Sequence, residues 1–248
     1  MIGAAITCQT PGFPSGRYPA PFILAFLLAV LSAGAIADGE SVALPSGFVY
    51  LDAVIPDIRL DLRYSGSHNF VGERIDGYRA PRAILSHEAA AALTKVQKDL
   101  RPFGLGLMVF DAYRPQRAVD HFVRWAQDLQ DTRTKAEFYP DVDKQDLFLE
   151  EYIAARSSHS RGSTVDLTLV ALDAPPGDVG LDMGTGFDFF GPESWPDYAG
   201  ATPAQHAHRL LLRSLMLQHG FKPYPKEWWH FTLAEEPYPE TWFDFPVQ

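Results

Sequence analysis

The sequence has 248 residues, of which 46% are hydrophobic and 21% are charged, so it can bury a substantial core within one compact domain. Its formal net charge of -10 argues against a polyanionic partner such as nucleic acid, because acidic residues outnumber the basic ones that would neutralise phosphates. A small or zwitterionic ligand stays compatible with this charge.

The N-terminal segment has the pattern of an export signal. A basic residue precedes an apolar run at residues 22–31, and Ala-Ile-Ala at residues 35–37 forms a cleavage pattern. The run is shorter than the about 20 residues that a membrane span needs, and an uncleaved anchor is the alternative. We expect residues 1–37 to be a signal peptide, residues 38–248 to be the mature domain, and the protein to be periplasmic or extracellular.

The single cysteine, Cys8, lies ahead of the apolar run, so the expected mature chain has no thiol. Disulfides and a cysteine nucleophile are then excluded. Any metal in the mature chain must be held by His, Asp or Glu side chains.

Three segments of the mature chain have the apolar spacing of helices. Ser86 is placed to cap a helix that runs to Leu100. A second helix is predicted to open at Arg114-Pro115, and a third to span residues 204–218 before Gly220. No linker, repeat or low-complexity tract separates these segments, which predicts a single domain.

Two other segments have the pattern of strands. Residues 105–110 form a short apolar run, typical of a buried strand that ends at Asp111. Residues 164–170 alternate, which predicts a half-buried strand with Asp166 pointing away from the apolar face. The polar segment from about 130 to 148 predicts a loop. Helices and strands in this order indicate the α+β class.

The first chemical cluster is a histidine in a tight polar turn followed by an aspartate on the next strand. His159 lies within Ser-Ser-His-Ser-Arg-Gly-Ser at residues 157–163, and the glycine lets the chain fold back toward Asp166. An imidazole and a carboxylate can bind one zinc ion at roughly 2.0–2.2 Å. The alternative is a solvated histidine and an aspartate paired with Arg161.

The second cluster is Glu-Trp-Trp-His at residues 227–230, which offers another histidine ligand and a carboxylate. Two histidines and one aspartate leave a fourth zinc position open, as catalytic sites require. Glu227 is then expected to take the proton of a water molecule, and a surface carboxylate beside Lys226 is the alternative. Since residues i and i+3 lie on opposite faces of a regular strand, Pro225-Lys226 must distort the chain.

The third cluster is Asp-Ala-Tyr-Arg-Pro at residues 111–115, where a buried strand meets a helix. A guanidinium fixed there could stabilise the negative charge that builds on a carbonyl oxygen during peptide hydrolysis. The alternative is that Arg114 pairs with Asp111 or Asp120 for structure alone.

Ordered motifs run along nearly the whole mature chain. Besides the three clusters they include Leu-Arg-Tyr at 62–64, Asp-Leu-Thr-Leu at 166–169, Phe-Asp at 187–188, Glu-Pro-Tyr-Pro at 236–239 and Phe-Asp-Phe-Pro at 243–246. In these motifs the chain resembles the D-alanyl-D-alanine dipeptidases, the VanX-type zinc metallopeptidases related to the D,D-carboxypeptidases. The resemblance implies an antiparallel-rich sheet, flanked by helices, that carries the zinc site.

The resemblance also implies the roles of individual residues. His159, Asp166 and His230 would bind one zinc ion, Glu227 would be the general acid and base, and Arg114 would stabilise the tetrahedral intermediate.

Three further residues would bind the charged ends of the dipeptide in a small closed site: Ser157, Asp188 and Tyr64. Asp188 would pair with the ammonium group, and an ordinary turn residue is its alternative. Spacing gives no independent indication of these three roles.

Two other functions compete with hydrolysis of free D-Ala-D-Ala. A D,D-carboxypeptidase or endopeptidase would apply the same metal chemistry to peptidoglycan stems in an open groove. A zinc-binding module without catalysis would have lost its base, whereas Glu227 is present. Resistance-type relatives work in the cytoplasm, so an export segment would instead suit scavenging or cell-wall recycling. We expect no stable membrane partner, and the oligomeric state is open.

Overall fold

The computed structural model describes residues 43–248 together with Gly12 and Gly16. Apart from these two glycines, the expected signal peptide lies outside the described residues. Within the part of the chain that is described, no helix combines the length and the apolar character needed to cross a membrane.

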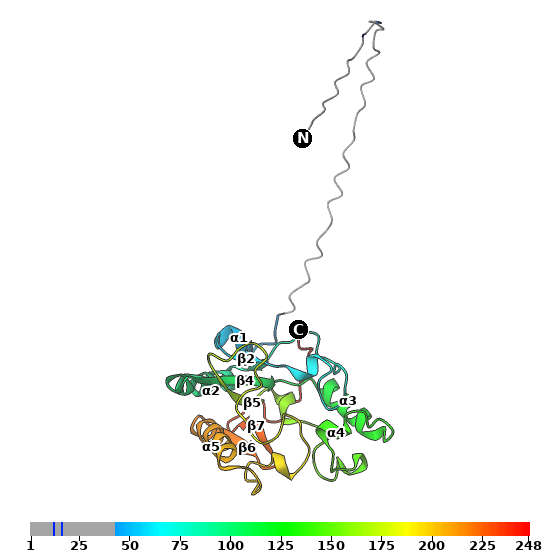
Figure 1. The fold of residues 1–248 in the computed structure, drawn as a ribbon, viewed down its shortest axis with the longest axis vertical. Coiled ribbons are helices and arrows are strands. Elements are labelled where there is room, and N and C mark those ends of the chain that lie inside the picture. The colour runs from blue at the N-terminus through cyan, green and yellow to red at the C-terminus, as the bar shows by residue number, and fades with distance from the viewer. Residues whose placement is uncertain (1–11, 13–15, 17–42) are drawn as a thin grey trace, which may run out of the picture. The chain divides into compact units, whose positions relative to one another are not determined.

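Seven strands form two sheets within residues 43–248. They are β1 (Phe48–Tyr50), β2 (Arg59–Leu60), β3 (Ile84–Ser86), β4 (Leu105–Asp111), β5 (Thr164–Ala171), β6 (Phe221–Tyr224) and β7 (Glu227–Leu233). The larger sheet has the order β2-β4-β5-β7-β6, and β1 pairs with β3 (Figure 1). Only β2 and β4 run parallel, and every other pair is antiparallel. The predicted α+β class and antiparallel-rich sheet are therefore confirmed.

Helices and short 3-10 turns connect these strands. The helices are α1 (Leu51–Val54), α2 (His87–Leu100), α3 (Gln116–Gln127), α4 (Lys135–Phe138) and α5 (Pro203–Gln218). The 3-10 turns are η1 (Arg63–Ser65), η2 (Arg101–Phe103), η3 (Lys144–Asp146), η4 (Ser158–Arg161) and η5 (Pro192–Ser194). Ser86 caps α2 as predicted, because its hydroxyl accepts a hydrogen bond from the Ala89 N–H at 3.3 Å.

The segment from 130 to 148 differs from the predicted loop. It contains α4 and η3, and its apolar residues Phe138, Tyr139 and Leu147 are buried in the core. Packing of these three side chains into the core stabilises α4 and η3. Because the segment is mostly polar and lacks helical periodicity, its sequence did not predict them.

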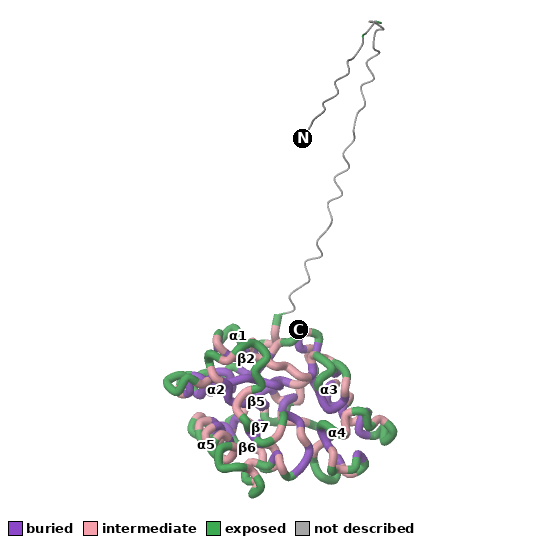
Figure 2. Tube along the Cα trace, in the orientation of Figure 1, coloured by how far each residue is buried: buried purple, intermediate pink, exposed green. Residues whose placement is uncertain are grey.

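The central strand β5 is buried on both faces, so the prediction of a half-buried strand was wrong (Figure 2). Asp166 and Thr168, on the polar face, are each only 1% exposed. The helices α2 and α5 contact the sheet, while α3 lies across the molecule from them in Figure 1. Val119 and Phe122 of α3 line one cavity with Asp166, whereas Thr168 lines a second cavity with residues of the 179–189 segment.

Candidate metal centre and active site

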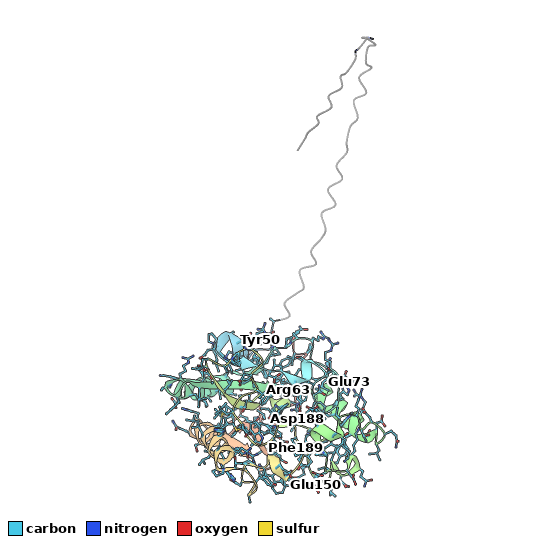
Figure 3. The ribbon with its side chains drawn as sticks, viewed as in Figure 1. Tyr50, Arg63, Glu73, Glu150, Asp188 and Phe189 are labelled. Carbon is cyan, nitrogen blue, oxygen red and sulfur yellow. The ribbon has the colours of Figure 1, made fainter. Side chains whose placement is uncertain are left out.

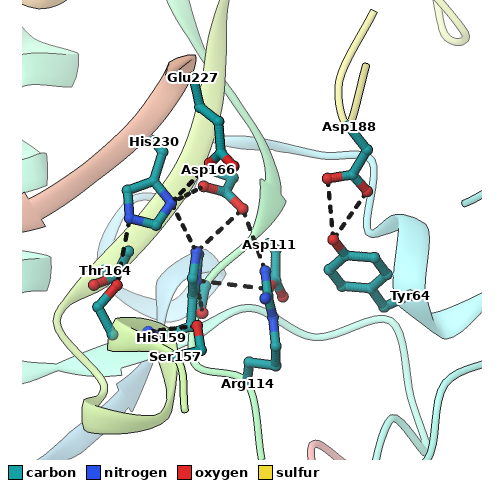
Figure 4. A network of polar contacts seen from close by, with 12 residues as sticks. Tyr64, Asp111, Arg114, Ser157, His159, Thr164, Asp166, Asp188, Glu227 and His230 are labelled. Atoms are coloured by element: carbon teal, nitrogen blue, oxygen red, sulfur yellow. Dashed lines mark hydrogen bonds and ion pairs between the residues drawn. The ribbon is translucent and has the colours of Figure 1, made fainter. Parts of the chain in front are cut away.

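Three potential metal ligands come together from neighbouring elements of the sheet (Figure 4). Asp166 of β5 stands directly opposite His230 of β7 in the antiparallel ladder. His159 lies on η4, which ends at Gly162 with a left-handed φ of 82° before β5 begins. The glycine thus permits the sharp turn that brings His159 over the strand it precedes.

The three donor atoms are spaced as the ligands of a single ion would be. The Nε2 atom of His159 lies 3.2 Å from the Asp166 carboxylate, and Nδ1 of His230 lies 3.1 Å from it. The two imidazole nitrogens are 3.3 Å apart. Ligands held at about 2.0–2.2 Å around a tetrahedral zinc ion are separated by roughly 3.3–3.6 Å. The residues therefore fit one zinc ion and leave a fourth position.

Each imidazole also has a polar partner at the ring nitrogen that does not face this point. Nδ1 of His159 lies 2.7 Å from the carbonyl oxygen of Ala112, to which it can donate only when protonated. Nε2 of His230 lies 3.3 Å from the hydroxyl of Ser158. Because a carbonyl oxygen only accepts, the Ala112 partner favours the tautomer of His159 in which Nε2 is unprotonated, as metal ligation requires. The Ser158 hydroxyl can donate or accept, so it is compatible with either tautomer of His230.

Glu227 faces the same point because β7 is irregular. Its Oε2 atom lies 3.3 Å from Nδ1 of His230. Pro223 of β6 pairs with Phe231, yet Tyr224 pairs with Glu227, so residues 228–230 have no partner in β6. This bulge places two residues at i and i+3 on one face of the strand. The distortion that the sequence required exists, although the register shifts at Pro223-Tyr224 rather than at Pro225-Lys226.

The electrostatics of this group favour a bound cation. Burial opposes a charge on His230, but the hydrogen bonds that its ring N–H donates to the carboxylates of Asp166 and Glu227 raise the pKa of this imidazole to about 9. Burial also opposes the charge on Asp166, yet the neighbouring His159 and His230 hold the pKa of its carboxyl below the usual range. The carboxylates of Asp166 and Glu227 thus converge on one point, where a positive charge is stabilised.

Arg114 forms the ion pair with Asp111 that the sequence offered as the structural alternative, and it also lies beside the cluster of potential metal ligands. Its Nε donates to the Asp111 carboxylate at 2.9 Å, and Nη2 lies 3.5 Å from Asp166. Asp120 is not its partner, since that carboxylate accepts from Gln116. The guanidinium is thus fixed by a structural ion pair and at the same time reaches the metal ligands.

Asp111 is a site residue that the sequence indicated only as a structural partner. It is 1% exposed, and its carboxylate accepts from the Tyr78 hydroxyl at 2.6 Å as well as from Arg114. Its Oδ2 also lies 3.5 Å from Nδ1 of His159. Its position at the end of a buried strand, just before the Tyr-Arg-Pro motif, could have indicated that Asp111 belongs to the site.

A cavity of about 460 Å³ joins these groups to the three predicted substrate-binding residues. The hydroxyl of Tyr64 donates to both carboxylate oxygens of Asp188, at 2.9 and 3.1 Å. Asp188 has a φ of 62° in its turn, but it is buried, and burial followed by the charge of Asp166 raises the pKa of its carboxyl. The hydroxyl of Ser157 accepts from the His159 N–H and so caps η4. Figure 3 shows Asp188 near the centre of the domain.

All eight residues singled out in the sequence line this one cavity: Tyr64, Arg114, Ser157, His159, Asp166, Asp188, Glu227 and His230. The structure therefore brings together side chains from six separate segments of the chain.

Comparison with known proteins identifies the family. The model of a peptidase family described as D-Ala-D-Ala dipeptidase matches residues 45–248. The chain belongs to the D-alanyl-D-alanine dipeptidase family. A D-alanyl-D-alanine dipeptidase of Streptomyces coelicolor is 46% identical over 200 residues, covering 81% of this chain and 98% of the relative.

Other relatives of the same description cover the same domain. One from Enterococcus faecium is 40% identical over 82% of this chain and 98% of its own length, and one from Escherichia coli is 34% identical over 75% and 84%. A solved vancomycin-resistance D,D-pentapeptidase in complex with Zn(II) is 14% identical, covers 65% of this chain and 78% of its own, and has a TM-score of 0.38. The last likeness is too slight to carry an argument.

The expected enzyme class is confirmed by the family. As a D-alanyl-D-alanine dipeptidase the chain is a metallopeptidase, and its two imidazoles and one carboxylate match the donor set of a catalytic zinc site.

Proposed function

We propose that this chain hydrolyses the free dipeptide D-Ala-D-Ala to two molecules of D-alanine, with zinc as its cofactor. The observation that carries the proposal is that one cavity joins a zinc-compatible group, a carboxylate facing it and a buried carboxylate for an ammonium group. A general acid and base beside an open metal position is what distinguishes a hydrolase from a zinc-binding module.

The catalytic roles follow from this geometry. Zinc held by His159, Asp166 and His230 supplies, when bound, a Lewis acid that polarises the scissile carbonyl and makes water more acidic. Glu227 accepts the proton of the attacking water and returns it to the amine that leaves, a role supported by its 3.3 Å distance from a ligand atom of His230. Arg114 donates to the carbonyl oxygen as negative charge develops there.

The substrate is held through its charged ends. Asp188 pairs with the ammonium group of the dipeptide, and the hydroxyl of Tyr64, which donates to both oxygens of this carboxylate, keeps it in place. Ser157 takes part in binding the other end of the dipeptide. A buried carboxylate discriminates strongly, because a ligand without the matching charge would leave it unpaired.

We also propose that the enzyme is exported and acts on fragments derived from peptidoglycan, in scavenging or recycling of the cell wall. The signal-like pattern of residues 1–37 supports this location. Fractionation of the host cell tests it: the mature chain is expected outside the cytoplasm, and a purely cytosolic enzyme would contradict export.

The central experiment measures D-alanine released from D-Ala-D-Ala and from a peptidoglycan pentapeptide by the zinc-loaded mature chain. Release from the dipeptide alone is expected. In Glu227→Ala, kcat on the dipeptide should fall by about 10²- to 10⁴-fold while the zinc content is retained, because this carboxylate moves protons and does not hold the metal. Efficient cleavage of the pentapeptide would instead indicate a D,D-carboxypeptidase, and no release from either would leave a zinc-binding module.

A further inference from the structure

A segment that the proposed mechanism does not use lies along the substrate cavity. Residues 150–156, here called the strap, connect the buried Leu147 to Ser157 and the metal ligand His159. Five strap residues line the cavity: Glu151, Tyr152, Ile153, Ala154 and Arg156. The strap therefore forms a wall of the site, and its position decides how much space a substrate has.

One fastening of the strap comes from the turn between β6 and β7. The ammonium group of Lys226 donates to the carbonyl oxygen of Glu150 at 2.8 Å and lies 3.2 Å from the Glu151 carboxylate. Lys226 directly precedes the proposed base Glu227. This latch consequently holds the strap against the catalytic end of the cavity.

A second fastening is an aromatic stack at the next residue of the strap. The ring of Tyr152 stacks on Phe190, with centroids 4.9 Å apart and an angle of 17° between the planes. Phe190 is two residues beyond Asp188, the proposed partner of the ammonium group, and lines the same cavity. The strap thus spans from the side of Glu227 to the side of Asp188.

The backbone between the two fastenings is held in an unfavourable conformation. Glu151 has a φ of 65°, a left-handed conformation that few residues other than glycine adopt. Its side chain is 68% exposed, so packing of Glu151 itself does not explain the conformation. The conformation belongs to a backbone turn in which the Glu151 N–H donates to the carbonyl oxygen of Phe148 at 3.2 Å and the Tyr152 N–H to that of Leu147 at 3.0 Å. The contacts of Lys226 and Tyr152 adjoin this turn on either side.

We propose that the strap, held by the Lys226 latch and the Tyr152 stack, limits the substrate to two residues. This inference rests on the proposed dipeptidase function. A peptide extended at its amino end must continue past Asp188, on the side of the cavity that the stacked rings of Tyr152 and Phe190 line. The strap thereby selects substrates by their length, whereas Asp188 selects them by the charge of their ammonium group.

The test compares kcat/KM for D-Ala-D-Ala-D-Ala with kcat/KM for D-Ala-D-Ala. Lys226→Met keeps the aliphatic stem but removes the latch, and it should raise the tripeptide-to-dipeptide ratio about 10-fold or more. Lys226→Arg can still donate and should keep the ratio low. Lys222→Met is the matched control, because Lys222 also lines the cavity but, among the described residues, its side chain forms no hydrogen bond or ion pair with the strap. A second variant, Tyr152→Leu, removes the stack and should raise the ratio too.

The wild-type enzyme distinguishes a failure of the proposed dipeptidase function from a failure of the strap proposal. If it cleaves the tripeptide as readily as the dipeptide, the proposed dipeptidase function fails. If it is selective, and folded, zinc-loaded Lys226→Met and Tyr152→Leu both keep its ratio, the strap proposal alone fails. Equal loss of both activities would also overturn it, since that outcome indicates a purely structural role. Should Lys226→Met not fold, Tyr152→Leu decides.

Discussion

Among single residues, Asp111 makes several polar contacts in the site, although in the proposed mechanism it binds neither the metal nor the substrate. It accepts from Tyr78 and Arg114, and it lies 3.5 Å from the imidazole of His159. Its charge therefore fixes the direction of the guanidinium and contributes to the orientation of one metal ligand. Partners of this kind commonly affect activity as much as moderate changes in the ligands themselves.

Asp111→Asn tests this positioning role. The amide keeps the size of the side chain but loses the charge that holds Arg114, so kcat on the dipeptide should fall about 10- to 100-fold with a smaller change in KM. Asp120→Asn is the matched control, because the carboxylate of Asp120 accepts from Gln116 and not from Arg114. Steady-state kinetics of both variants check the expectation, and equal activities would show that Asp111 does not position the site.

At the scale of elements, the sequence was informative where a pattern is local. The alternation of residues 164–170 predicted β5, and the cap at Ser86 predicted the beginning of α2. The register of β5 against β7, which sets Asp166 opposite His230, depends on pairing between segments more than 60 residues apart, and no local pattern encodes it. The resemblance to a family provided what spacing could not.

The bulge in β7 illustrates the same limit. The sequence showed that Glu227 and His230 could share a face only if the strand were distorted, but the partner that allows the distortion lies in β6. The polar face of β5 likewise faces segments from other parts of the chain, with α3 near Asp166 and residues 179–189 near Thr168. Residue types in the site were thus predictable, whereas their burial and the role of Asp111 required the assembled fold.

The turn from η4 into β5 yields a prediction at the same scale. Gly162 has a φ of 82°, and a Cβ atom there would lie 2.3 Å from the ring of Phe48. Gly162→Ala should lower the free energy of unfolding by about 2–4 kcal/mol, since backbone strain adds to overpacking of a buried ring. It should also weaken zinc binding, because the turn sets the position of His159.

Gly104→Ala is the matched control for this change. Gly104 has a φ of 69°, but a Cβ atom there would meet nothing within 4 Å, so only the backbone strain of about 1 kcal/mol is expected. Urea unfolding of both variants separates the two contributions. If both variants lost the same stability and kept the same affinity for zinc, the close approach of Phe48 would not matter.

At the scale of the whole molecule, the candidate metal centre lies on the inner strands of the sheet. The charges of its buried side chains therefore affect the free energy of unfolding of the whole domain. Asp111, Asp166 and Asp188 are buried within one connected region, with the single guanidinium of Arg114 among them. Buried carboxylates in excess of their counter-ions cost free energy in the folded state. A bound divalent cation offsets this cost, and it binds only weakly to an unfolded chain because its ligands are then dispersed.

Zinc should therefore stabilise the folded domain substantially. When free zinc exceeds the dissociation constant about 100-fold, the expected gain is about 2.7 kcal/mol, which corresponds to roughly 5–10 °C in Tm for a domain of this size. Thermal unfolding of the mature chain with a chelator, and again after zinc is restored, measures the difference. His230→Ala removes one of the three ligands and should reduce the zinc-dependent shift strongly, whereas Lys222→Met should leave it unchanged. A wild-type Tm that does not respond to zinc would mean that His159, Asp166 and His230 do not form the metal site, because a ligand that binds only the folded state must raise its stability.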